Sequence, residues 1–397
     1  MKVVGVQEML KELPLWDPAI RSEMDSLFVQ KEALRVVPRE EVEDIRRRHP
    51  DLNSLPAKLV ITRKAGGKRK IRIVVCGNYA EKNPEDELYA GGSDSISLRA
   101  ALKKASQEGW LGVTADLRTA FLNAPLPGGG EEDGTLVMIN PPRLLVKLGY
   151  VEPTVQWMAI KAMYGLRQSP KTWGDFRDAT LAKMEWEVDG EIISLQPLAS
   201  DPNVWRLVTT TDEIEQTTVG LMLVYVDDLM LLARLEMLRR TLERIKEDWA
   251  LSLSEPEWLN DRSPVRFLGV EVWLTSEGIF LKKENYVRDL FKRNDEVEGV
   301  SSGVPITKDQ AVALDEEDPS KTAEDVRMAQ KATGELMWLA TKTRPDLMYV
   351  MSRMSQVGGQ VRKYLRKTLS CGLWIRPSGR SKNRLRLHAL FPLVSDL

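Results

Sequence analysis

Two adjacent carboxylates interrupt the most apolar stretch of the chain. Asp227 and Asp228 lie inside VGLMLVYVDDLMLLAR (219–234). An isolated ionised carboxylate is unstable in apolar surroundings unless it reaches water, a cationic partner or a metal ion. The order of an apolar run, two aspartates and a second apolar run predicts a β-hairpin with the pair at its tip. Because aspartate is also a natural turn residue, a solvent-exposed turn without chemistry is an equally good interpretation of this segment by itself.

A third carboxylate favours the chemical interpretation. Asp116 ends a second apolar strand in WLGVTADLRTAFLNAPL (110–126) and precedes a short helix that Pro125 stops. If the two strand ends are neighbours, three carboxylates meet, and such hard oxygen ligands suit Mg²⁺. Two such ions, about 3.5–4 Å apart, can activate an attacking hydroxyl and stabilise the leaving oxygen in a displacement at phosphorus. With two histidines in the whole chain, metal-assisted phosphoryl transfer is the most economical hypothesis.

Composition limits the other classes of function. The chain has 397 residues, enough for two or three domains, and its 43% hydrophobic and 29% charged content is ordinary for a globular protein. A net charge of −1 gives no global argument for a nucleic-acid partner. Two cysteines are too few for a disulfide framework. The N-terminal segment lacks a signal-peptide pattern, and residues 219–233 are too short and too charged to span a bilayer, so we expect a soluble, intracellular protein.

Several elements must position these carboxylates. Residues 58–76 read as two strands joined by a Gly-Gly turn with a basic tip, comprising Arg63, Lys64, Lys68, Arg69, Lys70 and Arg72. Residues 266–274 alternate as a strand, and 313–325 form the best candidate for a linker. Helical periodicity is found over 171–186, 233–249, 283–293, 328–342 and 346–356. Strands and helices alternate irregularly, which predicts an α+β layer fold rather than a doubly wound sheet.

Five segments together resemble a known family. They are VTADLRTAFLNAPL (113–126), KAMYGLRQSPKTW (161–173), LVYVDDLMLLA (223–233), RFLGVEV (266–272) and GELMWLATKTRPDLMYVMSRMSQ (334–356). Their order and approximate spacing are similar to those of reverse transcriptases of Ty1/copia-type LTR retrotransposons. Trp16, Glu23 and KIRIVV (70–75) resemble the N-terminal part of that family, so the resemblance extends over about residues 16–375.

The resemblance implies a right-hand polymerase with fingers, palm and thumb, in which the catalytic hairpin belongs to an antiparallel palm sheet. It implies an N-terminal extension (1–15), fingers and palm (16–275), a thumb-like or post-palm helical region (276–376) and a basic disordered tail (377–397). We expect RNase H, integrase and protease regions to be absent from this chain.

By the same resemblance, Asp116, Asp227 and Asp228 are the catalytic residues and the ligands of two Mg²⁺ ions, for which Mn²⁺ can substitute. Asp116 and Asp227 would bind both metals directly, and Asp228 would complete or orient the site. Neighbouring residues on a strand point to opposite faces, which is consistent with unequal roles for the pair.

Two substrate-binding predictions concern the sugar and the triphosphate. Phe121 resembles a steric gate that excludes the 2′-hydroxyl, and the motif match favours this interpretation over the alternative of a core residue in the short helix. Lys70 and Arg72 lie where fingers cations hold the incoming triphosphate; the simpler alternative is a solvated basic hairpin. We expect one of the two to bind the triphosphate and the other cations of the tip to contact template phosphates.

Further predicted contacts come from two segments. Tyr164, Gly165 and Gln168 resemble residues that line the nucleotide and the template base, with Gly165 allowing close backbone approach. The alternative is a plain turn before the helix that starts near Pro170. Residues 267–269 resemble the hairpin that supports the primer end, or they are packing residues.

The expected function is RNA-directed DNA synthesis on an RNA template and a DNA primer from dNTPs, by a chain that is normally part of a Gag-Pol-type polyprotein. The expected location is the cytoplasm, in virus-like particles, or the nucleus. Two alternatives remain open at this point. The chain is either a catalytically inactive retroelement remnant that binds nucleic acid, or another palm-type nucleotidyl enzyme such as a cyclase.

Overall fold

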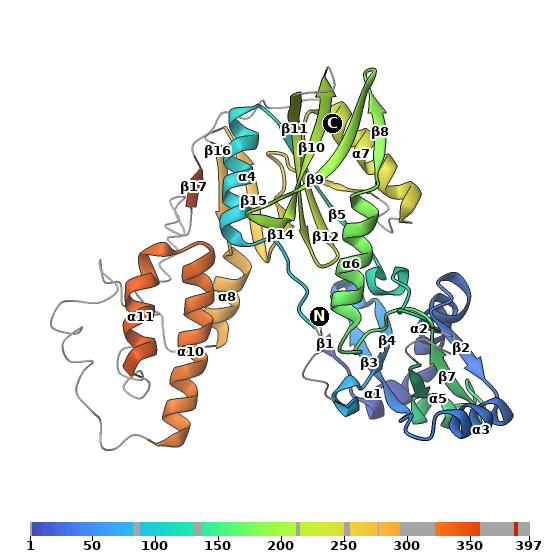
Figure 1. Ribbon diagram of the computed structural model, residues 1–397. Coiled ribbons are helices and arrows are strands. Elements are labelled where there is room, and N and C mark those ends of the chain that lie inside the picture. Colours follow the sequence, from blue (N-terminus) through green and yellow to red (C-terminus); the bar gives the residue numbers. More distant parts are fainter. Residues whose placement is uncertain are drawn as a thin grey trace.

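The computed structural model describes residues 2–81, 88–129, 136–211, 215–249, 255–276, 278–293, 322–357 and 385–387. Three sheets, the helices that pack beside them and a group of C-terminal helices make up this part of the chain (Figure 1). The combination of helices with mainly antiparallel sheets confirms the predicted α+β fold. No helix in the described ranges is both long enough and apolar enough to cross a bilayer.

The N-terminal part is built on a six-stranded sheet of order β1-β3-β6-β7-β2, with β4 paired to β3. Its strands are β1 (Lys2–Val3), β2 (Leu34–Val37), β3 (Leu55–Arg63), β4 (Arg69–Val75), β6 (Met138–Asn140) and β7 (Gln156–Ala159). Its helices are α1 (Val6–Lys11), α2 (Leu13–Asp25), α3 (Arg39–Arg48) and α5 (Arg143–Lys147), with a π-helical segment at Ser26–Gln30. The β3–β4 hairpin is the one predicted over 58–76, and β1 makes the expected N-terminal extension part of this sheet.

The central sheet has seven strands in the order β13-β5-β12-β11-β10-β9-β8, and all its pairings are antiparallel. Its strands are β5 (Leu111–Asp116), β8 (Glu185–Val188), β9 (Glu191–Leu198), β10 (Asp201–Thr211), β11 (Glu215–Tyr225), β12 (Asp228–Ala233) and β13 (Glu257–Trp258). Strands β11 and β12 form the predicted hairpin with the two aspartates at its tip. This antiparallel sheet is the expected palm sheet.

Strand β12 is apolar from Leu229 to Ala233 because both faces of the central sheet are covered. Leu229 and Leu231 pack into the cluster that also contains residues of α6 (Ser169–Leu181) and α7 (Leu235–Asp248). Met230 and Leu232 alternate to the other face, where α4 (Ser95–Gln107) packs. A strand buried on both faces loses the usual alternation of apolar and polar residues. The helix predicted over 233–249 is confirmed as α7.

The helix predicted over 171–186 is wrong at its C-terminal end. Helix α6 ends at Leu181, and residues 185–188 form β8 instead. Asp189 and Gly190 have φ values of 53° and 84° and join β8 to β9 by a two-residue turn. Turns with two residues in the left-handed region match the twist of a hairpin, so the chain reverses here.

The single strand predicted over 266–274 is also wrong, for the same reason. Strand β14 (Val265–Phe267) pairs with β15 (Val270–Thr275) through a turn at Leu268 and Gly269, whose φ values are 51° and 70°. The buried apolar positions are Val265 and Phe267 on β14 but Val270, Val272 and Leu274 on β15, so the alternation shifts by one residue across the turn. Strand β14 is only three residues long, which is too short for its own alternation to be recognised in the sequence.

The C-terminal part consists of a four-stranded sheet, β14-β15-β16-β17, and three helices that share a small core. The remaining elements are β16 (Gly278–Lys282), β17 (Leu385–Leu387), α8 (Glu284–Arg293), α10 (Ala323–Lys342) and α11 (Met348–Val357), with a 3₁₀ turn at Pro345–Leu347. The three helices confirm the predictions over 283–293, 328–342 and 346–356.

Two predicted segments fall largely outside the described residues. Of the linker predicted over 313–325, residues 313–321 lie outside, and the last three residues already belong to α10. Within the tail expected to be disordered, Leu385–Leu387 instead form β17 and pair with the edge strand β16. The backbone groups of that edge would otherwise have no strand partner on this side.

Candidate metal centre

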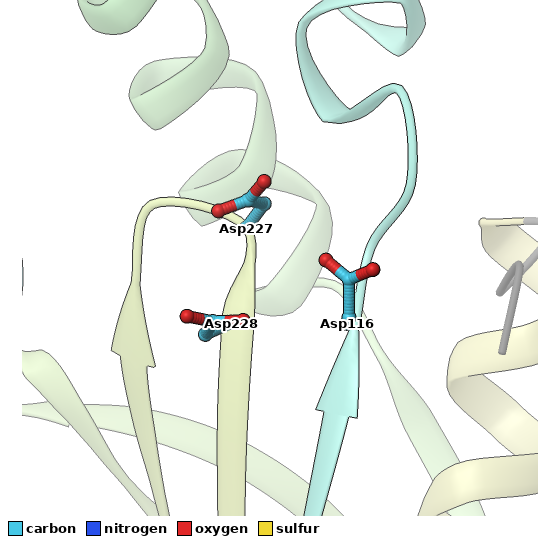
Figure 2. Close-up of side chains that lie close together, drawn as sticks. All are labelled: Asp116, Asp227 and Asp228. Carbon is cyan, nitrogen blue, oxygen red and sulfur yellow. The ribbon is translucent and has the colours of Figure 1, made fainter. Parts of the chain in front are cut away.

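The structure brings Asp116, Asp227 and Asp228 together. One carboxylate oxygen of each lies within 4.8 Å of the others. Asp116 ends β5, Asp228 begins β12, and the two residues are direct partners in the antiparallel register. Figure 2 shows the carboxylates of Asp116 and Asp227 beyond the strand ends, whereas that of Asp228 lies further along the hairpin. The three carboxylates therefore meet in the fold, as the positions of the two strand ends predicted.

The turn that carries Asp227 is strained and held from two sides. Val226 has a φ of 57°, which is rare for a β-branched residue and costs about 1–3 kcal/mol. The Val226 carbonyl accepts a hydrogen bond of 2.8 Å from the indole Nε1–H of Trp173 on α6. The carbonyl of Asp227 accepts a hydrogen bond of 2.8 Å from the backbone N–H of Leu117, the residue after Asp116. These contacts tie the tip of the hairpin to α6 and to the end of β5.

The carboxylates repel one another in a partly buried setting. Burial raises the pKa of Asp227, and the charge of Asp116 adds to this effect, while Arg72 and Lys70 act against it. Burial, followed by the charges of Asp227, Asp116 and Glu257, raises the pKa of Asp228 to about 6. A divalent cation would relieve this repulsion, and three converging carboxylates are the hard oxygen donors that Mg²⁺ or Mn²⁺ prefers. The donor set therefore fits such an ion.

Three of the predicted substrate residues touch one another beside the carboxylates. The guanidinium of Arg72 lies over the ring of Tyr164, 4.7 Å from its centroid. The Tyr164 ring meets that of Phe121 edge to face at 5.8 Å. Lys70 is two residues before Arg72 on β4, so both side chains leave the same face of that strand. Burial raises the pKa of Tyr164 to about 12, so its phenol is neutral at physiological pH.

Gly165 has a structural role in this fold. Its φ is 91°, and a Cβ at this position would collide with the carbonyl oxygen of Val75 on β4. The neighbouring backbone is bonded to the same segment: the Val75 N–H donates to the Tyr164 carbonyl (2.8 Å) and the Gly77 N–H to that of Gly165 (3.1 Å). The predicted close backbone approach therefore exists, but it is made to strand β4.

Two further predicted segments lie in packed surroundings. Gln168 precedes α6, where its carbonyl accepts the Thr172 N–H at 2.9 Å, and it lines a cavity together with Leu126. At the β14–β15 turn, Phe267 and Leu268 are buried, as the packing interpretation expects. A primer-supporting role for residues 267–269 stays a prediction.

The basic tip of the β3–β4 hairpin divides into two faces. Arg63 and Arg69 both donate to the same carboxylate oxygen of Glu12, at 2.9 Å each, and Arg69 also lies over the ring of Trp16. These two arginines therefore anchor the hairpin to the N-terminal helices. Their contact with template phosphates stays a prediction. Lys70 and Arg72 lie on the opposite face, toward the carboxylates.

Two residues near the centre have contacts that no sequence pattern indicated. Glu23, on α2, accepts a hydrogen bond of 3.0 Å from the backbone N–H of Ile73. Burial raises the pKa of the Glu23 carboxyl, while the charges of Arg72 and Lys70 act against this shift. Glu23 is part of the family resemblance, which was its one signal. Trp173 is likewise the last residue of the resembling segment 161–173, but nothing in the sequence indicated its partner, a backbone carbonyl 53 residues away along the chain.

Comparison with known proteins agrees with this geometry. A family model described as "Reverse transcriptase (RNA-dependent DNA polymerase)" matches residues 42–308, more than half of the chain, and this range includes all three aspartates. The retrovirus-related Pol polyprotein from transposon RE1 of Arabidopsis thaliana is 25% identical over 335 residues, which cover 81% of this chain and 20% of that protein.

Two more likenesses were found. The putative transposon Ty5-1 protein of Saccharomyces cerevisiae is 25% identical over 247 residues, covering 61% of this chain and 68% of that protein. A foamy viral protease–reverse transcriptase, solved in complex with double-stranded DNA, is 15% identical with a TM-score of 0.45 and covers 89% of this chain and 47% of its own. The chain spans about a fifth of the length of the Arabidopsis relatives.

Proposed function

Since the chain belongs to the reverse transcriptase (RNA-dependent DNA polymerase) family, of the copia type that its motifs resemble, we propose that it is an RNA-directed DNA polymerase. It would extend a DNA primer on an RNA template with dNTPs. The observation that carries this proposal is the convergence of Asp116, Asp227 and Asp228 from the paired strands β5 and β12. Membership of this family removes the support for a cyclase.

In the proposed reaction, the oxygen of the primer 3′-hydroxyl forms a bond to the α-phosphorus of the dNTP. The bond between that phosphorus and the pyrophosphate oxygen breaks, and the hydroxyl proton is lost to solvent. Asp116 and Asp227 would hold two divalent cations, and Asp228 would complete the site from one step along the hairpin. Bound cations of this kind activate a hydroxyl and neutralise charge on the transferred phosphoryl group.

The chain's own contribution is to position these groups. The bonds from Trp173 and Leu117 fix the turn before and at Asp227, so its carboxylate needs little reorganisation when a cation binds. Like-charged carboxylates held together in a half-buried site are poorly stable without a cation, which favours cation binding.

Lys70 and Arg72 would bind the triphosphate. Their side chains leave the face of β4 opposite to that of Arg69, which binds Glu12. Their positive charges act to lower the pKa of Asp227. The ring of Tyr164 under the Arg72 guanidinium restricts its orientation, so less conformational entropy is lost when phosphate oxygens bind. Cations at this place stabilise the charge that develops on the leaving pyrophosphate.

Phe121 would select the sugar. It follows the strand end that carries Asp116 and lies edge-on against Tyr164, so its ring is held in place beside the carboxylates. A fixed ring beneath the sugar would leave no room for a 2′-hydroxyl.

In the full-length context we propose that the chain works as part of a Gag-Pol-type polyprotein in the cytoplasm, because its Arabidopsis relatives are Pol polyproteins.

Primer extension tests the proposed function. The purified chain is given an RNA template, a labelled DNA primer, dNTPs and Mg²⁺, beside Asp227→Asn and the surface variant Asp189→Asn. We expect extension by the wild type and by Asp189→Asn, and a loss of at least about 10³-fold in Asp227→Asn. A folded wild-type chain that binds primer–template but adds no nucleotide would contradict the proposal and identify an inactive remnant.

A further inference from the structure

Helices α3 and α5 border a groove of about 640 Å³ in the N-terminal part. Arg39, Glu43 and Arg46 line it from α3, at helical spacings that put them on one face of that helix. Arg143 and Lys147 line it from α5, four residues apart. Both helices lie well away from the tip of the β11–β12 hairpin (Figure 1), so the groove is separate from the metal centre.

The groove carries positive charge that nothing in the described part of the chain neutralises. Arg39 and Glu43 form an ion pair at 3.0 Å and compensate each other. Arg46, Arg143 and Lys147 are exposed and form no ion pair or side-chain hydrogen bond with any described residue. Since the whole chain has a net charge of −1, three uncompensated cations in one groove are a local feature. Clustered cations of this kind attract an anionic ligand.

The floor of the groove is neutral. The side-chain amides of Asn140 and Gln156 bind each other at 2.6 Å, and Val42, Val146 and Val155 provide apolar surface. A neutral floor between cationic walls suits a ligand whose charges lie along its edge and whose remaining surface is sugar or base. A volume of about 640 Å³ is the size of a small-ligand site, which suits a short stretch of one strand better than the wider body of a duplex.

We propose that this groove binds the sugar–phosphate backbone of an unpaired nucleic-acid strand. Arg46, Arg143 and Lys147 contact its phosphates, and the binding is independent of sequence. The inference rests on the proposed function in one respect: the strand is identified as the single-stranded template that has not yet reached the carboxylates. The groove then holds the template straight and slows its dissociation during synthesis.

Fluorescence anisotropy with the full chain tests this binding. The probes are RNA–DNA primer–templates with either a long or a short single-stranded 5′ template overhang. The variants are Arg46→Gln and Arg143→Gln in the groove, with Arg47→Gln as the matched control. Arg47 is next to Arg46 on α3 and loses the same charge, but it pairs with Asp44 at 3.6 Å and does not line the groove.

We expect each groove variant to weaken binding of the long-overhang probe about three- to tenfold. The slope of log affinity against log salt should fall by about 0.7 per cation removed. The groove variants should bind the short-overhang probe as tightly as the wild type does. Arg47→Gln should bind both probes like the wild type. Equal losses in Arg46→Gln and Arg47→Gln, or no change in affinity and salt slope, would overturn the proposal. So would binding of inorganic triphosphate in the groove without any effect on RNA.

The outcome is separable from that of the proposed function because the anisotropy assay has no catalytic step. If no variant extends a primer but the groove variants lose the long-overhang probe, the groove proposal holds and the polymerase proposal fails. If short-overhang templates are extended normally and long-overhang binding is unchanged in Arg46→Gln, the polymerase proposal holds and the groove proposal fails.

Discussion

The indole Nε1–H of Trp173 donates a hydrogen bond of 2.8 Å to the carbonyl of Val226, the residue that precedes the two tip aspartates and has a left-handed backbone. Trp173 is almost completely buried, so the bond is shielded from water. The bond connects α6 to the tip of the hairpin on the central sheet. The orientation of Asp227 therefore depends on a side chain in a different element.

Trp173→Phe should lower kcat more than it raises the KM for dNTP. The change keeps an aromatic ring but removes the donor, which leaves the Val226 carbonyl without its partner at a cost of about 1–2 kcal/mol, or roughly tenfold in kcat. The affinity for Mn²⁺, measured by titration with the apo chain, should fall with it. Trp249→Phe is the control, because its ring contacts Trp173 and its Nε1–H has no partner among the described residues. Equal losses in both variants would point to packing instead.

Without divalent ions, the chain should lose stability as the pH rises through about 6. The pKa of Asp228 is raised from its usual 3.8 to about 6 in the folded state, so the unfolded chain releases this proton first. Between these two values the free energy of unfolding falls with pH, and Asp228→Asn should abolish that part of the fall. Because the group is partly exposed, we expect a gain on the order of 1 kcal/mol for Asp228→Asn at pH 7.

Urea unfolding with EDTA at several pH values measures this effect. Added Mg²⁺ should stabilise the wild type at pH 8 more than at pH 5, since protons compete for the carboxylates. If the free energy of unfolding depends on pH in the same way for the wild type and Asp228→Asn, the raised pKa of Asp228 does not cause the loss of stability.

Phe121→Ala should relax selection against ribonucleotides. Removing the ring opens space beside the sugar, so the ratio of kcat/KM for dNTP over rNTP should drop by at least about tenfold. Phe121→Tyr keeps the ring and should retain most of the discrimination. Single-nucleotide incorporation kinetics measure both, and an unchanged ratio in Phe121→Ala would identify a core residue.

Gly165→Ala should unfold at a markedly lower denaturant concentration than the wild type. A Cβ there meets the Val75 carbonyl in addition to adopting a φ of 91°, and we expect a loss of about 2–4 kcal/mol. Gly190→Ala is the control, with a φ of 84° and open space around the added atom, and should cost about 1 kcal/mol. Equal costs at both positions would mean that the backbone of β4 moves aside.

Patterns that depend on neighbours in the chain were sufficient for several elements. The apolar runs around Asp227 and Asp228 predicted the hairpin, and 3.6-residue periodicity predicted α7. The Gly-Gly turn predicted the β3–β4 hairpin. The order of motifs identified the family that the comparisons with known proteins confirm. In each case the signal lies within one segment or in the order of segments.

The other features of the site depend on tertiary structure. The register that sets Asp116 opposite Asp228 depends on which strands pair. The division of the basic tip, with Arg63 and Arg69 on Glu12, depends on where the N-terminal helices pack. Local periodicity does not encode either fact, because burial and pairing are set by contacts between distant segments. The sequence by itself determined which groups could bind a metal, and only the packed sheet determined that they meet.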